Sequence, residues 1–209
     1  MDIVTRISEA LQKGDQGSVA SLTTEALEQS LEPRTILDEG LIAGMDVIGE
    51  RFRIHEIFLP EVLLAARAMY AGLDQLEPLL AASGIPSRGK VVIGTVQGDL
   101  HDIGKNLVGI MLRGAGFEVI DLGNDVSPEA FVTTAREKEA RVIGMSALLT
   151  TTMPVMGETV EKLEREGLRN EIHAIVGGAP VSDDFASQIG AVAYGFDGLS
   201  AVEIVKRLV

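Results

Sequence analysis

Hydrophobic residues in the first 82 positions recur at the spacing of an α-helix. Ile3, Ile7 and Leu11 are four residues apart, which places them on one face of a helix. Three further stretches show helical spacing: Val19, Leu22 and Ala26; Ile36, Leu37, Leu41, Met45 and Ile48; Leu63, Leu64, Met69, Leu73 and Leu76. Gly14, Pro33 and Pro60 lie where one stretch gives way to the next. The pattern predicts four amphipathic helices with short connections, which form a small bundle.

A different pattern follows residue 90. Short apolar runs rich in β-branched residues alternate with segments of helical spacing, which predicts a parallel sheet covered by helices on both faces. The five runs are 91–96, 117–123, 141–148, 172–178 and 191–196. The stretch 83–90 between the two patterns contains Gly84, Pro86 and Gly89, which suit a linker. We therefore expect an α/β protein with a four-helix bundle over residues 1–85 and a Rossmann-like (flavodoxin-like), five-stranded parallel-sheet domain over 86–209.

Ligands of open parallel sheets bind at the carboxyl ends of the strands, where the strand order reverses. If the order is 2-1-3-4-5, the loops after strands one, three and four line one edge of the sheet. The first of these loops contains Asp99, His101, Asp102, Ile103 and Gly104; the second contains Ser146, Leu148, Thr150, Thr151 and Thr152; the third contains Gly177 and Gly178. These residues are the candidates for a ligand site.

Charge and composition exclude several kinds of partner, site and location. The formal net charge of −13 disfavours nucleic acid and anionic membranes as partners. The chain has no cysteine, which excludes disulfides, thiolate metal sites and cysteine nucleophiles. Its first residues do not form a secretory signal, and it has no apolar run long enough to span a membrane. We expect a cytoplasmic protein.

Three motifs resemble the signature of the cobalamin-binding domains of corrinoid-dependent methyltransferases and mutases. That signature is D-x-H-x-x-G, then S-x-L, then G-G. Residues 99–104 read DLHDIG, residues 146–148 read SAL, and Gly177 and Gly178 form the final pair. The gaps between the motifs, 105–145 and 149–176, contain 41 and 28 residues, and the first is the usual family spacing.

The first half of the chain extends the resemblance. RFRIHEIFLPEVLLAARAM, residues 51–69, is similar to the end of the helical cap of methionine synthase and of small corrinoid proteins in methyl-transfer systems. In that pattern a Phe and a Leu seven residues apart, here Phe52 and Leu59, cover the upper face of the corrin. His55 and Ile57 depart from the Gly, Lys or Tyr that relatives often have there.

The resemblance implies a role for each motif residue. His101 would bind cobalt through Nε2 as the lower axial ligand, a suitable role for imidazole on a transition metal. Asp99 would accept a hydrogen bond from the other ring nitrogen, and Ser146 would hydrogen-bond Asp99 in turn. Gly104, Gly177 and Gly178 would make room for the nucleotide tail, and Asp102, Ile103, Leu148 and Thr150 would complete the cofactor site.

The resemblance also implies a function. A protein of this family holds cobalamin, in its methylcobalamin form during turnover, and carries a methyl group. It takes the methyl on cobalt(I) from a substrate-specific methyltransferase, and a second methyltransferase passes the methyl to tetrahydrofolate or a thiol. A reductive activator would restore cobalt(I). Overall similarity favours O-demethylation of methoxylated aromatics among the methyl sources.

Two other functions of cobalamin-binding proteins stay open, regulation of transcription and carbon-skeleton rearrangement. A dinucleotide-binding site is a weaker alternative. A cobalamin-dependent regulator would need a basic DNA-reading segment, and none is visible. The small subunit of a carbon-skeleton mutase shares the D-x-H-x-x-G motif but generally lacks the amino-terminal bundle. The glycines Gly94, Gly98 and Gly104 do not have the G-x-G-x-x-G spacing of a dinucleotide site.

Overall fold

The computed structural model describes residues 2–82 and 87–209. The chain divides into two units, which we call the helical unit and the sheet unit. The helical unit is Met1–Ser87 with Gly114–Gly116, and the sheet unit is Arg88–Arg113 with Phe117–Val209. Part of the predicted linker, residues 83–86, lies outside the described residues, and the domain boundary at 85/86 stays a prediction.

The helical unit contains the four predicted helices. The first two are α1 (Ile3–Gln12) and α2 (Gln16–Glu28), and the last is α5 (Leu59–Ala82). The third is a continuous run of α3 (Pro33–Thr35), a π-helical segment η1 (Ile36–Ile42) and α4 (Ala43–Arg53). Periodicity predicted this run but not its π-helical part, because a π segment changes the register by a fraction of a turn.

Side-chain caps and small residues explain this arrangement. Asp2 and Asp15 cap α1 and α2 by accepting from the backbone N–H groups of Thr5 and Ser18. A Cβ on Gly40 would lie 3.2 Å from the Ile7 side chain, so this glycine lets the π segment approach α1 closely. The buried core of the unit includes Ile7, Leu11, Ile36, Leu41, Ile48, Met69 and Leu76.

The sheet unit has the predicted parallel sheet, in the order β2-β1-β3-β4-β5. Its strands are β1 (Lys90–Thr95), β2 (Glu118–Asp121), β3 (Val142–Ser146), β4 (His173–Gly177) and β5 (Ala193–Gly195). All four pairings are parallel. The fold class and the strand order predicted from the sequence are therefore confirmed.

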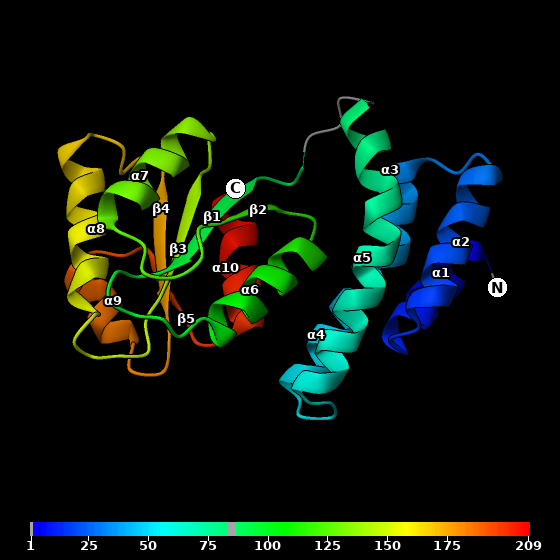
Figure 1. Ribbon diagram of the computed structural model, residues 1–209, viewed down its shortest axis with the longest axis horizontal. Coiled ribbons are helices and arrows are strands. Elements are labelled where there is room, and N and C mark those ends of the chain that lie inside the picture. Colours follow the sequence, from blue (N-terminus) through cyan, green and yellow to red (C-terminus); the bar gives the residue numbers. More distant parts are fainter. Residues whose placement is uncertain (1, 83–86) are drawn as a thin grey trace. The chain divides into compact units, whose positions relative to one another are not determined.

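Helices cover both faces of this sheet (Figure 1). They are α6 (Ile103–Gly114), α7 (Pro128–Glu137), α8 (Pro154–Arg165), α9 (Asp183–Ile189) and α10 (Gly198–Leu208). On one face Phe131 of α7 and Met156 of α8 join Val92 and Ile143 in a single hydrophobic core. Because both faces are covered, the middle residues of the central strands are apolar, and the polar residues that can hold a ligand lie at the strand ends and in their loops.

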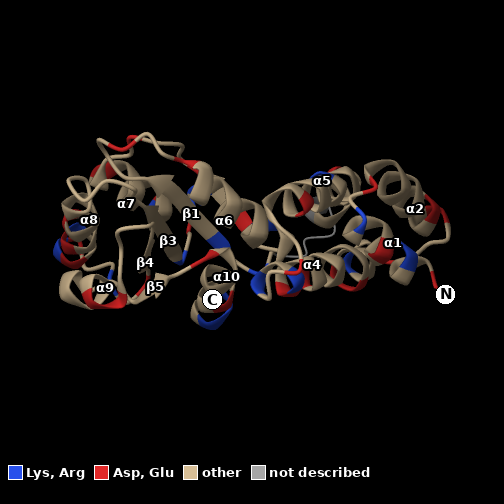
Figure 2. Ribbon diagram, turned by 90° about the horizontal axis from the view of Figure 1, so that it is seen from below, with Lys and Arg blue, Asp and Glu red and all other residues tan. Residues whose placement is uncertain are grey.

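Lys and Arg are interspersed with Asp and Glu along the helices (Figure 2). On α7 and α8, for example, Lys162 pairs with Glu129 and Glu166. Within residues 2–82 and 87–209, we find no helix with the length and apolar character needed to cross a bilayer.

Candidate functional site

Three loops meet at the carboxyl edge of the sheet, as the strand order predicted. Past the end of β1, the Val96 N–H donates to the Ser146 carbonyl at 3.0 Å, and past β3 the Ala147 N–H donates to the Gly177 carbonyl at 3.2 Å. These bonds extend the ladders of β1, β3 and β4 into the loops, so the three motifs are held side by side.

Asp99 is the centre of this edge. Its side chain is fully buried, although it sits in a loop. One carboxylate oxygen, Oδ1, accepts from the His101 N–H at 3.0 Å and contacts His101 Nδ1 at 2.8 Å. The other, Oδ2, accepts from the N–H groups of Leu148 and Leu149 at 2.7 and 3.0 Å, and from the Thr152 hydroxyl at 3.1 Å. The carboxylate therefore joins the loop after β1 to the loop after β3.

These hydrogen bonds decide the charge of Asp99. Burial opposes ionisation, because it removes the charge from water. The donors outweigh that effect: the His101 and Leu148 N–H groups, the His101 ring and the Leu149 N–H lower the pKa of the carboxyl well below its ordinary range. Asp99 is therefore a fixed negative charge at neutral pH.

An ionised carboxylate can only accept, so the His101 nitrogen facing it, Nδ1, must carry the proton. The neutral tautomer then leaves a lone pair on Nε2. The His101 side chain is 54% exposed, whereas its partner is completely buried. A buried carboxylate thus fixes the tautomer and the direction of an imidazole that faces outward, which is how proteins orient histidine ligands of metals.

The hydrogen bond from Ser146 to Asp99 that the resemblance implies stays a prediction. Ser146 is the last residue of β3, and no hydrogen bond in the described part of the chain joins its hydroxyl to Asp99. The hydroxyl that contacts Asp99 belongs to Thr152, which is 7% exposed. Its single proton is shared between Asp99 Oδ2 at 3.1 Å and the Leu149 carbonyl oxygen at 2.8 Å. The loop after β3 turns back after Leu148, and this turn brings Thr152 to the carboxylate. Any role of Ser146 in cofactor binding stays a prediction.

A run of three threonines, 150–152, was the only sequence signal for this partner. Thr150 and Thr151 are exposed, and only Thr152 is buried. Thr150 stays a predicted cofactor contact, but it takes no part in the hydrogen bonds of Asp99 among the described residues.

The glycines of the first and third motifs differ in the space beside them. A Cβ on Gly178 would lie 1.9 Å from the Ala147 carbonyl oxygen, and the residue has φ +127°, so the protein itself requires glycine there. A Cβ on Gly177 would lie 3.0 Å from the Gly195 carbonyl oxygen. At Gly104 a Cβ would meet no atom within 4 Å. The structure therefore accounts for Gly178 by packing and leaves open space beside Gly104.

Large apolar side chains near His101 in the sequence, and Leu148 in the loop after β3, are exposed to solvent. Leu100 and Ile103, on either side of the His101–Asp102 pair, are 69% and 76% exposed, and Leu148 is 44% exposed. Asp102 directly precedes α6, and its carbonyl accepts the first helical hydrogen bond, from Asn106 N–H at 2.8 Å. Large exposed apolar side chains near an oriented polar group indicate a binding surface.

The predicted capping residues lie at one tip of the helical unit. Phe52 is in the last turn of α4 and Leu59 begins α5, and both are half-buried. His55, between the two helices, is exposed with φ +59°. Their predicted contact with the upper face of a corrin stays a prediction.

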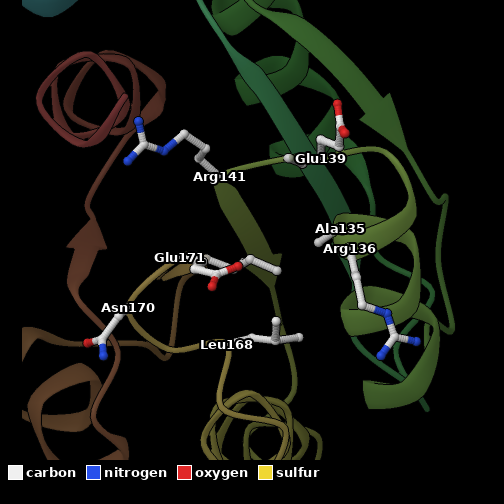
Figure 3. A pocket seen from close by; sticks show the side chains of 9 residues that line it. Ala135, Arg136, Glu139, Arg141, Leu168, Asn170 and Glu171 are labelled. Carbon is white, nitrogen blue, oxygen red and sulfur yellow. The ribbon is translucent and has the colours of Figure 1, made fainter.

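The opposite, amino edge of the sheet has a groove of a different kind (Figure 3). It is lined by Ala135, Arg136, Glu139, Ala140, Arg141, Leu168, Asn170, Glu171 and Ile172. Acidic and basic side chains alternate around it, and Arg136 is paired with Glu166. None of the residues singled out by the motifs lines this groove.

The site at the carboxyl edge fits a metal held mainly by a macrocycle. Nowhere in residues 2–82 and 87–209 do three His, Asp or Glu side chains gather to hold a bare metal ion. A single oriented imidazole suits a metal whose other ligands come from a ring, and Leu100, Ile103 and Leu148 suit the apolar edge of that ring. An oriented imidazole on a parallel-sheet edge is compatible with a corrinoid, the ligand that the resemblance of the motifs implies.

Comparison with known proteins agrees with a corrinoid ligand. Residues 89–204 match a family described as B12 binding domain, and residues 3–77 match a second B12 binding domain family. The chain is 41% identical over 211 residues to a corrinoid protein of Desulfitobacterium hafniense, covering 100% of this chain and 98% of that one. It is also 41% identical to trimethylamine corrinoid protein 1 of Methanosarcina mazei, covering 98% and 96%.

Among solved structures, the chain resembles one chain of the methanol:cobalamin methyltransferase complex of Methanosarcina barkeri. The TM-score is 0.88 at 32% identity, with 98% of this chain and 78% of that chain covered. The protein belongs to the B12-binding corrinoid proteins, and it binds cobalamin.

Proposed function

We propose that this protein is a methyl carrier, in which cobalamin binds at the carboxyl edge of the sheet with His101 as the lower axial ligand of cobalt. The observation that carries the proposal is the orientation of His101 by the buried, five-fold hydrogen-bonded Asp99. When bound, cobalamin supplies a cobalt centre that can accept a methyl group and release it again. The protein supplies binding, orientation and a fixed charge.

Asp99 has a definite task in this proposal. Its charge strengthens the donor character of the imidazole, because the Nδ1 proton is shared with a carboxylate. The Leu148 and Leu149 N–H groups and the Thr152 hydroxyl hold that carboxylate from the other side. The strength of histidine donation is therefore set by the loop after β3 as well as by the histidine loop.

The relatives support the methyl-carrier class. Several are named trimethylamine or dimethylamine corrinoid proteins, at 39–44% identity, and one solved relative is a complex of methanol:cobalamin methyltransferase. We infer that the partners are a substrate-specific methyltransferase, a second methyltransferase acting on tetrahydrofolate or a thiol, and a reductive activator. The names favour a methylated amine or methanol as the methyl source over the methoxylated aromatic that overall resemblance suggested.

Phe52 and Leu59 complete the proposal. They would cover the upper face of the corrin and be displaced when a partner methyltransferase docks. Both side chains are half-buried at the tip that joins α4 to α5, so they can be presented to a ligand without unfolding either helix.

The test is transfer of a labelled methyl group. The protein is loaded with cobalamin, reduced, and mixed with the methyltransferase encoded beside its gene and with 14C-methyl trimethylamine, methanol or a methoxylated aromatic. Label that becomes protein-bound with one of the three substrates, and that leaves again on addition of the second methyltransferase, supports the proposal. Failure of every substrate to label a protein that demonstrably holds reduced cobalamin would overturn it.

A further inference from the structure

The loop after β1, which contains His101, is also held by the loop after β2. This second loop lies on the side of β1 opposite to β3, whose following loop bonds the Asp99 side chain. We call residues 96–102 the histidine loop and residues 122–126, which follow β2, the clamp loop. The Gly98 N–H donates to Asp125 Oδ1 at 2.8 Å, and the Asp125 N–H donates to the Asp99 carbonyl at 3.1 Å. Asp125 of the clamp loop therefore holds two backbone groups of the histidine loop, the Gly98 N–H and the Asp99 carbonyl.

The backbone of Asp125 is held in an uncommon conformation. Its φ is +56°, in the left-handed region that non-glycine residues seldom occupy and that Asp and Asn tolerate best. Gly98, its partner, has φ +84°. Two such residues facing one another define a tight, specific junction between the loops, although Asp125 itself is exposed.

Thr95 makes a third connection at the other end of the histidine loop. It is the last residue of β1, is fully buried, and donates its hydroxyl to the His101 carbonyl at 3.1 Å. Its own backbone is bound to the clamp loop: the Thr95 N–H donates to Gly123 and the Val126 N–H donates to Thr95, at 2.9 and 3.0 Å. The carbonyl of the histidine is thus tied to the central strand of the sheet.

We propose that Thr95 and Asp125 are positioning residues, which set the direction of the His101 imidazole through the main chain of the histidine loop. Neither acts on the imidazole directly; they fix the backbone at Gly98, Asp99 and His101. A metal ligand must be held within a fraction of an ångström to bond well, and such support comes from residues behind it. The inference rests on the proposed role of His101 as a ligand of cobalt.

Two substitutions isolate these contacts. Thr95→Val keeps the shape and removes the hydroxyl, while Thr95→Ser keeps the hydroxyl. Asp125→Gly keeps the left-handed backbone at no steric cost and removes the acceptor, while Asp125→Asn keeps an acceptor oxygen and tolerates the same φ.

The sheet unit also offers matched controls away from the site. Thr159 is a fully buried threonine whose hydroxyl donates to the Val155 carbonyl within α8, so Thr159→Val controls for loss of a buried hydroxyl. Glu139 has the same φ of +56° at the amino edge, so Glu139→Gly controls for the effect of glycine on the unfolded chain.

The experiment measures histidine ligation directly. Each variant is loaded with cobalamin, reduced to cobalt(II), and its electron paramagnetic resonance spectrum is recorded with 15N-labelled histidine. We expect Thr95→Val and Asp125→Gly to lower the ratio of histidine-bound to unbound cobalt(II) about three- to ten-fold, the range that loss of one ordinary hydrogen bond allows. Thr95→Ser and Asp125→Asn should restore most of the ratio, and Thr159→Val and Glu139→Gly should leave it unchanged.

Two failures can be told apart. If the wild-type spectrum shows no coupling to histidine nitrogen, the role of His101 is wrong, and this inference fails with it. If the wild type shows that coupling and Thr95→Val and Asp125→Gly show the same ratio, the role of His101 stands and the positioning role is wrong. A change in the stability of the apo-protein alone, with an unaltered spectrum, also contradicts the positioning role.

Discussion

The two edges of one sheet carry opposite kinds of surface. At the carboxyl edge a buried carboxylate accepts five hydrogen-bonding contacts and orients a half-exposed imidazole, and Leu100, Ile103 and Leu148 are exposed. At the amino edge the groove of Figure 3 is lined by charged side chains of both signs. The groove lies at the amino edge, whereas the buried carboxylate and the imidazole that it orients lie at the carboxyl edge.

The difference lies in how polar groups are supported. Arg136 at the amino edge is paired with Glu166 where solvent can reach it, an interaction worth little to stability. Asp99 has no contact with solvent, so each of its donors must stay in place. We therefore place the functional site at the buried, hydrogen-bonded Asp99 and not at the groove of the amino edge.

The largest expected effect comes from Gly178→Ala. The new Cβ would overlap the Ala147 carbonyl, and we expect a loss of about 4 kcal/mol or more from the stability of the sheet unit. Hydrogen exchange of the β3 amides in the apo-protein measures it. Gly104→Ala is the matched control: its Cβ meets nothing in the protein, so stability should hold while cobalamin affinity falls. Equal stability of the two variants would contradict the assignment of Gly178 to packing.

Asp99→Asn should have the next largest effect. An amide can present only one oxygen, so either His101 or the Leu148, Leu149 and Thr152 donors lose their acceptor. We expect a loss of about 3 kcal/mol, typical of broken hydrogen bonds to a buried charge. The comparison at the amino edge is Glu171→Gln, which should change stability by no more than about 0.5 kcal/mol. Similar values for the two variants, from the same exchange measurement, would remove the distinction between the edges.

The advantage of wild type over Asp99→Asn should depend on pH. Because the folded-state pKa of Asp99 is lowered, its ionised form stabilises the fold at every pH above the unfolded value of about 4, and this stabilisation is lost as pH falls below that value. The difference in unfolding free energy should be constant from pH 7 to about 5 and should narrow below about pH 4. Urea unfolding across that range is the measurement, and a difference independent of pH would show that Asp99 is not stabilised as an anion.

A smaller effect separates Thr152 from Ser146. Thr152→Val removes a hydroxyl from Asp99 and should cost about 1 kcal/mol and shift the cobalt(II)/(I) potential, whereas Thr152→Ser should not. Ser146→Ala should change neither quantity much. Spectroelectrochemistry of the cobalamin-loaded variants decides between the two hydroxyls; a larger shift for Ser146→Ala would restore the arrangement that the sequence suggested.

Most of the fold could be predicted because its signals are local. Strands β1, β3 and β4 are apolar runs, and the order assumed for them is one of the common orders of doubly wound parallel sheets. The motif places His101 and Asp99 in one loop, and their contact spans only two residues. Residues that act across the fold were harder to predict. Thr152 contacts Asp99 across 53 positions of sequence, and Asp125 contacts Gly98 across 27. The spacing of the motifs does not predict either contact.

Ligation of cobalt by His101 is the central claim, and nitrogen coupling in the cobalt(II) spectrum tests it most directly. The protein is prepared with 14N- or 15N-histidine, loaded with cobalamin and reduced, and the same is done for His101→Ala and for His173→Ala at the amino end of β4. We predict that the splitting changes with the isotope in wild type and His173→Ala and does not change in His101→Ala. A wild-type spectrum that is identical with either isotope would contradict the account.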